Sequence, residues 1–260
     1  MAVSRRGYIF SAFLLGVLCV LLIVVSIASD SWVRFYFYTA PHHERDSNIR
    51  YGLFRGEMSI YELATPDINT LYMTCTAEFN ACALSCKTEQ EARLIEVFFY
   101  LNTYLLSTIT TSVPIRPVIT FAFYVSVLVI LFLQLAFAVT AAALAIINAT
   151  KNPTEPVFGL PGCLWSNVIT AILGSTVLLM FGIYWATSGL KDHLAVSYIA
   201  IGLFVPAPSL GYSYWVLITA VLCSLANIGL IQGRAYLLEK NPPPSTIKLE
   251  NHSDGTIFLY

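Results

Sequence analysis

Charged residues are scarce in this chain of 260 residues. Asp, Glu, Lys and Arg together make up 11% of it, whereas a typical soluble domain carries roughly 25%. Lys and Arg number 14 and Asp and Glu 15, so neither sign is in excess and no nucleic acid is indicated as a partner. Hydrophobic residues make up 57%, and this composition indicates a protein whose main solvent is the lipid bilayer.

Four segments contain no charged residue at all, and each is long enough for a membrane span of about 20 residues. They are Tyr8–Ser29, Val118–Ile147, Val157–Leu190 and Leu194–Gly233. Hydrocarbon offers the backbone no hydrogen-bond partner, so these segments are expected to be helices, which satisfy their own amides. A membrane barrel would instead alternate polar and apolar residues, and no such alternation occurs.

The last of these segments is longer than one span, but its first part is too short to cross. As a helix, residues His193–Val205 would rise only about 20 Å before Pro206, short of a hydrocarbon core of roughly 30 Å. We therefore predict four membrane helices. Their expected bounds are Tyr8–Ser29, Val118–Ile147, Leu164–Ala186 and Ser213–Gln232.

Basic residues close to the predicted spans indicate the orientation, because short flanks follow the positive-inside rule and long loops escape it. With the N-terminus in the cytoplasm, six basic residues lie inside and only Lys191 lies in the short outer loop. The six are Arg5, Arg6, Lys151, Arg234, Lys240 and Lys248. We expect a plasma-membrane protein with both termini, the loop 148–163 and the tail 233–260 in the cytoplasm, and the loop 187–212 outside.

The first loop, residues 30–117, is the only long polar segment and is expected to form an extracellular domain. Its stretches WVRFYFYT and YGLFRGEMSIYEL are rich in aromatic and branched residues, which is typical of short strands. The later stretch EQEARLIEVFFYLNTYLL predicts a helix that ends before Pro114. The expected fold is an all-α membrane protein: a bundle of four transmembrane helices with a small domain of mixed strand and helix in the first loop.

Cysteines cluster in the same loop, at Cys75, Cys82 and Cys86. An extracellular loop is oxidising, so one disulfide among the three is expected, and the spacing does not decide which two pair. A metal site of Cys82 and Cys86 with the adjacent pair His42 and His43 is the weaker alternative, because this spacing matches no established ligand pattern.

Sequence motifs of enzymes and transporters are missing. The four histidines are scattered between loops and tail, and no catalytic triad order or glycine-rich phosphate loop accompanies them. The predicted spans carry no charged side chain, although such residues commonly mark transport pathways. We therefore expect neither enzymatic activity nor a bound cofactor or metal ion.

Small residues recur at four-residue spacing in the predicted spans, which indicates close helix packing. Gly229 and Gly233 are such a pair in the last span. This pair could pack against another helix of the same bundle, which we expect, or against a second copy of the chain.

The C-terminal residues Phe258, Leu259 and Tyr260 follow an extended spacer, NPPPS. A terminal hydrophobic-x-hydrophobic carboxylate is suited to adding a strand to a PDZ domain. A PDZ-type or cytoskeletal scaffold is therefore a predicted partner of the tail, beside the bilayer itself.

A tryptophan directly after the first span and a GLF sequence in the first loop resemble the four-span claudin and peripheral-myelin superfamily. The longer stretch YGLFRGE resembles the signature of the clarin family, and VPIRPVI, GLPGCLW and the ending IFLY are similar to clarin stretches at corresponding places. The residues that carry the motif are Trp32, Tyr51, Gly52, Leu53, Phe54 and Gly56. The resemblance covers most of the chain.

The stretch YGLFRGE is expected to be a segment of the extracellular sheet that lies over the bundle. Gly52 and Gly56 would permit close approach of the backbone, and Leu53 and Phe54 would supply buried surface. The alternative is that this stretch contacts a partner protein.

The chain departs from clarins in its cysteines and its glycosylation sequence. No cysteine precedes Tyr51 in the first loop, the first to follow it is Cys75, and the clarin sequon of that loop is missing. The disulfide and the sugar of the family therefore do not transfer to this chain.

The clarin resemblance implies a plasma-membrane organiser of actin-supported structures and synapses in sensory cells, including those of hearing. One alternative is a claudin-like adhesion or barrier protein, whose first loop would meet loops on a neighbouring cell. Another is an auxiliary subunit that binds a channel through the same loop.

Overall fold

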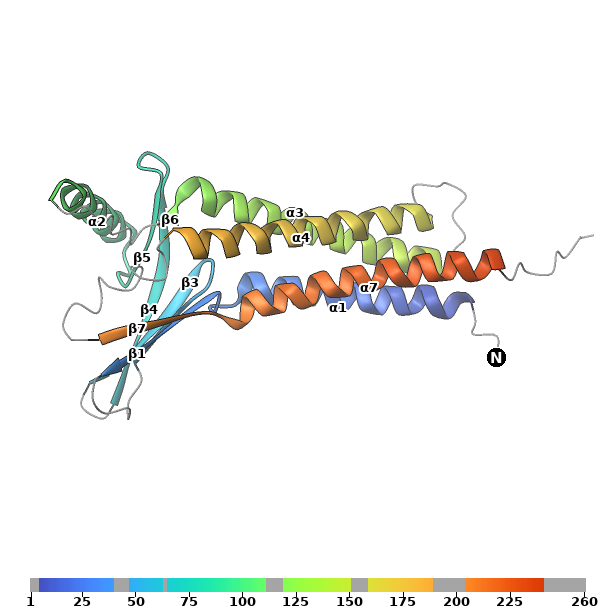
Figure 1. Cartoon of the computed structure of the whole chain (residues 1–260), viewed down its shortest axis with the longest axis horizontal. Helices are drawn as coiled ribbons and strands as arrows, with labels where there is room; N and C mark the ends of the chain where they lie inside the picture. Colours follow the sequence, from blue (N-terminus) through green and yellow to red (C-terminus); the bar gives the residue numbers. More distant parts are fainter. Residues whose placement is uncertain are drawn as a thin grey trace, which may run out of the picture.

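Four long helices form an antiparallel bundle, and a sheet covers one end of it (Figure 1). The computed structural model describes residues 5–39, 47–62, 65–110, 119–150, 159–188 and 204–240. All four helices are long and apolar enough to cross a membrane, which confirms a multi-pass membrane protein with four spans. The first helix begins and the last helix ends at the end of the bundle away from the sheet.

The helix bounds agree with the predicted spans to within a few residues except at the end of the last helix. The helices are α1 (Arg5–Ala28), α3 (Phe121–Thr150), α4 (Leu160–Thr187) and α7 (Tyr212–Lys240). Helix α4 begins before the predicted Leu164 because Pro161 is tolerated in a first turn, where its missing amide proton costs no hydrogen bond. Helix α7 continues past Gln232 to Lys240.

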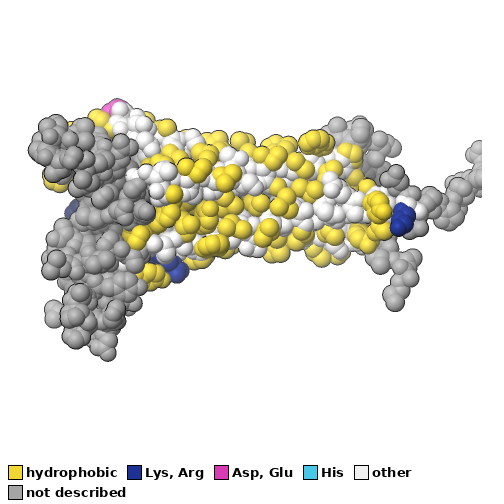
Figure 2. Space-filling model, viewed as in Figure 1, with side chains coloured by type: hydrophobic (Ala, Val, Ile, Leu, Met, Phe, Trp, Pro, Cys, Tyr) yellow, Lys and Arg dark blue, Asp and Glu magenta, His cyan; other side chains and the backbone are white. Residues whose placement is uncertain are grey.

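Each helix of the bundle packs against two others. Helix α1 contacts α3 and α7, and α4 contacts the same two helices. Small residues permit this packing: a methyl group added to Gly16 of α1 would stand 3.4 Å from the side chain of Ala142 in α3. On the face that Figure 2 shows, hydrophobic side chains are spread along the bundle as a hydrophobic belt, as expected of a lipid-facing surface.

The sheet is antiparallel and seven-stranded, in the order β6-β5-β4-β3-β2-β1-β7. Its strands are β1 (Val33–Thr39), β2 (Ser47–Tyr51), β3 (Arg55–Glu62), β4 (Thr65–Thr76), β5 (Ala81–Ser85), β6 (Ile119–Thr120) and β7 (Phe204–Leu210). The first loop thus contains strands, as predicted.

The second loop also contributes to this sheet, which the sequence did not predict. Strand β7 pairs with β1, with Leu210 opposite Val33 and Pro206 opposite Phe37. Its two prolines cannot donate ladder hydrogen bonds, and both lie in a strand at the edge of the sheet, where proline is tolerated. Residues 189–203 of this loop lie outside the described part of the chain.

The predicted helix of the first loop is present as α2 (Gln90–Thr110), on the side of the sheet away from the bundle (Figure 1). It contacts β4 and β5. Glu96 of α2 accepts a hydrogen bond from the hydroxyl of Ser85, and the Arg93 guanidinium lies 4.9 Å from the ring centre of Tyr72. These contacts hold the helix against the sheet.

One disulfide joins neighbouring strands of the first loop, as expected. It links Cys75 of β4 to Cys82 of β5, which face each other in the register of the two strands. Cys86 takes no part in it. The alternative metal site at Cys82 is wrong, since this sulfur is bonded, and its proposed ligands His42 and His43 lie outside the described residues.

Candidate functional site

Trp32 lies where the sheet meets the bundle, directly after α1. Its side chain is 1% exposed, and its indole Nε1 donates a hydrogen bond to the carbonyl oxygen of Ser26 at 2.8 Å. The ring packs edge-on against Phe181 of α4 at 5.0 Å and lies 6.4 Å from Tyr214 of α7. Trp32 also donates its backbone amide proton to the carbonyl of Tyr51 at 2.9 Å, so one residue joins the sheet to three helices.

The YGLFRGE stretch forms the end of β2, the start of β3 and the turn between them, so the prediction that it belongs to the sheet over the bundle is confirmed. Tyr51 ends β2, Arg55 begins β3, and the Gly52 amide donates to the Arg55 carbonyl at 2.7 Å. The Leu53 carbonyl accepts a hydrogen bond from the Tyr124 hydroxyl of α3 at 2.8 Å. The turn therefore adds α3 to the helices that the sheet contacts.

Both glycines of the turn lie against backbone, as predicted. A methyl group on Gly52 would overlap the carbonyl oxygen of Ser29 and stand 2.8 Å from the Cα of Asp30. A methyl group on Gly56 would stand 2.6 Å from the Cβ of Tyr51. A larger residue at Gly52 must push the turn away from the end of α1, and a larger residue at Gly56 must push β3 away from β2.

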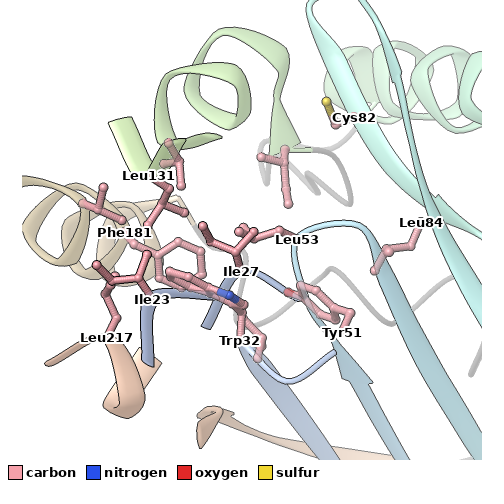
Figure 3. Packing of buried hydrophobic residues seen from close by; sticks show 14 of the residues in the cluster. Ile23, Ile27, Trp32, Tyr51, Leu53, Cys82, Leu84, Leu131, Phe181 and Leu217 are labelled. Atoms are coloured by element: carbon pink, nitrogen blue, oxygen red, sulfur yellow. The ribbon is translucent and has the colours of Figure 1, made fainter. Parts of the chain in front are cut away.

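The two apolar side chains of the turn differ in burial. Leu53 is 5% exposed and lies beside Tyr51 and Trp32 under the sheet (Figure 3). Phe54 is 43% exposed, so the expectation that it supplies buried surface is wrong. At a tight turn adjacent side chains point to different sides, and only one of the two can face the bundle.

A small apolar recess lies between the turn and the bundle. Its walls include Leu53, Phe181 and Tyr184, and its volume of about 20 Å³ is room for one water-sized molecule. The hydroxyl of Tyr51 is buried here without a hydrogen-bond partner among the described residues. Burial, and secondarily Tyr184, raise the pKa of Tyr51 well above its ordinary 10.0, so the phenol stays neutral.

Exposed apolar side chains that were not predicted gather on α2. Ile95, Phe98 and Phe99 are 70%, 47% and 65% exposed, and Phe98 lies 5.6 Å from the ring of Phe79 in the β4–β5 turn. Val97, by contrast, is 1% exposed. The spacing of 95, 98 and 99 in a loop helix is the signal that would have revealed a second apolar face. We call Phe79, Ile95, Phe98 and Phe99 the α2 patch.

Polar residues inside the bundle connect its helices. The amide of Asn227 in α7 lies 3.3 Å from the side-chain oxygen of Asn167 in α4. When the Asn227 side-chain amide is rotated by 180°, its nitrogen instead donates a hydrogen bond to the Ala12 carbonyl of α1 at 3.1 Å. Gln134 is fully buried, and its amide has no partner among the described residues, while Gln232 is exposed.

Gly229 and Gly233 do not pack inside the bundle, so this expectation is wrong. Both are exposed, and a methyl group on either would meet nothing within 4 Å. The predicted tail motif, Phe258 to Tyr260, lies outside the described residues. In the part of the chain that is described, no three His, Cys, Asp or Glu residues come close enough to hold a metal ion.

Comparison with known proteins does not assign this chain to a family. No protein-family model matches it. No curated protein matches it either. The resemblance to clarins therefore remains a prediction based on the motif residues.

Proposed function

We propose that this protein is a non-enzymatic organiser of the plasma membrane, similar to clarins, with both termini in the cytoplasm. The observation that carries the proposal is the junction of sheet and bundle. Trp32 and the Gly52–Leu53 turn contact all four membrane helices through Ser26, Tyr124, Phe181 and Tyr214. Such a junction holds the sheet in one orientation relative to the bilayer.

Helix α2 lies on the side of the sheet away from the bundle (Figure 1), and a fixed sheet therefore presents the exposed side chains of the α2 patch in one orientation. Exposed apolar residues on a loop domain favour protein partners. On the opposite side of the membrane, the tail residues Phe258 to Tyr260 would bind a PDZ-type scaffold linked to actin. The protein would thus connect an extracellular or membrane partner to the cytoskeleton, in sensory cells if the clarin resemblance is correct.

Proximity labelling in intact cells tests this function. We compare the full chain with Ile95→Ser, with a chain that lacks residues 258–260, and with Gln90→Ser as the control. Gln90 is an exposed polar residue of the same helix that lies on another face than Ile95, Phe98 and Phe99, so its replacement leaves the α2 patch intact. Ile95→Ser should lose neighbours on the sheet side and the truncated chain should lose a cytoplasmic scaffold. Unchanged neighbours for both variants would contradict the proposal.

A claudin-like adhesion protein is the second candidate, and the exposed apolar side chains of the α2 patch also favour it. Expression in non-adherent cells separates the two. Accumulation at cell contacts that Ile95→Ser abolishes would support adhesion, whereas diffuse surface display with capture of a scaffold by the tail would support the organiser. An auxiliary subunit would instead copurify with a pore-forming chain.

A further inference from the structure

Strands β1 and β2 carry a polar recess on the face opposite the buried core. Phe35 of β1 is buried, so its strand neighbours Arg34 and Tyr36 point to the other face. In the register of the two strands, Arg34 lies opposite Arg50 and Tyr36 opposite Asn48. These four side chains line a recess of about 80 Å³. It is separate from the motif turn and from the α2 patch.

The charge of this recess is not balanced. Like charges directly opposite each other in neighbouring strands repel. Arg50 is paired with the carboxylate of Glu57 at 2.9 Å. Arg34 donates from Nε to the hydroxyl of Ser31 at 3.0 Å and has no acidic partner in the described part of the chain. The recess therefore offers an anion one uncompensated guanidinium, with a second beside it.

The recess lies at the depth of lipid headgroups. The Arg34 guanidinium is 5.6 Å from the ring centre of Tyr212, the first residue of the membrane helix α7. Tyr212 and Trp215 are 45% and 59% exposed, and exposed aromatic residues at the end of a span mark the level of the headgroups. Basic side chains are also visible where the hydrophobic belt ends beside the sheet (Figure 2). Phosphate is the anion that every phospholipid supplies at this depth.

We propose that this recess binds the phosphate of a phospholipid in the leaflet on the sheet side. The planar guanidinium groups of Arg34 and Arg50 match the oxygens of a phosphate and form charge-assisted hydrogen bonds with it. The Tyr36 hydroxyl and the Asn48 amide are neutral donors for the remaining oxygens. A bound phosphate neutralises the uncompensated charge of Arg34 and holds the β1–β2–β7 side of the sheet to the membrane surface. This site goes beyond the proposed function and does not depend on it.

Native mass spectrometry of the full chain in detergent tests the site with three probes. Phosphatidylcholine has a phosphate and no net charge, digalactosyldiacylglycerol has the same acyl chains and no phosphate, and phosphocholine has the phosphate without acyl chains. We expect the chain to retain phosphatidylcholine and to retain the other two much more weakly. Arg34→Gln should weaken the retention about tenfold or more, because it removes a charged hydrogen-bond donor. Retention of phosphatidylcholine by Arg34→Lys should lie between that of the native chain and that of Arg34→Gln.

Arg55→Gln is the matched control. Arg55 is an exposed arginine of the neighbouring strand β3 and does not line the recess, so its replacement should leave retention unchanged. Equal loss with Arg55→Gln would show diffuse attraction and overturn the proposal. Equal retention of the galactolipid would overturn a phosphate site, and equally tight binding of phosphocholine would show a site for free phosphate esters and not for a lipid.

The test does not depend on the folding of one variant. If Arg34→Gln fails to fold, Tyr36→Phe serves in its place, with a several-fold loss expected from one missing donor. Unchanged retention by Tyr36→Phe, together with equal retention of both lipids by the native chain, would overturn the proposal.

Discussion

Replacing Gly52 by alanine should separate the sheet from the bundle. The added methyl group would overlap the Ser29 carbonyl oxygen and crowd the Cα of Asp30, and both atoms belong to backbone that cannot rotate away. Overpacking of this kind costs about 1–3 kcal/mol when flexible side chains relieve it. Here the turn itself must retreat, which also exposes Leu53 and breaks its hydrogen bond from Tyr124.

The cost of that retreat can be worked from the contacts. Exposure of a buried leucine costs roughly 1.5–3 kcal/mol and loss of one hydrogen bond about 0.5–1.5 kcal/mol. We therefore expect Gly52→Ala to lower the free energy of unfolding by about 3 kcal/mol, measured by reversible unfolding in mixed detergent micelles with tryptophan fluorescence as the signal. Trp32 lies at the junction and reports on its opening.

Gly229→Ala is the matched control, since it adds the same atoms where nothing lies within 4 Å. In a helix this change should raise stability by roughly 0.5–1 kcal/mol. Gly52→Ala should thus lower the free energy of unfolding, and Gly229→Ala should raise it. If Gly52→Ala were as stable as the native chain, the close approach of the turn to the end of α1 would be refuted.

Three further predictions concern single contacts. Cys75→Ser should lower the free energy of unfolding by about 2–3 kcal/mol, because the disulfide to Cys82 closes a loop with a sequence separation of 7; the native chain in reductant should match the variant, and an unchanged unfolding curve would contradict this. Tyr51→Phe should be neutral or slightly stabilising at pH 7, because the buried hydroxyl has no partner among the described residues. Since folding raises the pKa of this phenol above 10.0, the native chain should lose stability as the pH rises above 10.0, and the variant should lose less; equal losses would count against a buried neutral Tyr51. Asn227→Leu should destabilise the bundle by about 0.6–1.7 kcal/mol through its lost interhelical hydrogen bond, measured in the same unfolding assay, and a gain in stability would disprove that role.

The spans and the loop helix were predictable because their signal is local. A long uncharged segment has few alternatives to a helix in lipid, so α1, α3, α4 and α7 follow from hydropathy alone. The helix α2 follows from its own residues and from the prolines after it. The close packing of Gly52 was also predictable, since glycine between bulky residues often marks a place where backbone approaches closely.

Strand β7 was not predictable in this way, and neither was the different burial of Leu53 and Phe54 in the turn. Residues 204–210 contain two prolines, which argue against a strand, and they form one only because β1 offers an edge to pair with. Phe54 and Leu53 are equally apolar neighbours, and the shape of the turn decides which of them is buried. Likewise Gly229 and Gly233 have a packing spacing but face away from the bundle.

By itself the sequence determined that this chain has four membrane helices, a strand-containing first loop with a helix, and one disulfide in that loop. Only the tertiary structure decided which cysteines pair, that the second loop completes the sheet, and that Trp32 joins the sheet to the helices. It also placed Arg34 opposite Arg50. The physical reason is that hydropathy acts on each segment separately, whereas strand register and side-chain facing depend on segments far apart in the chain that meet only after folding.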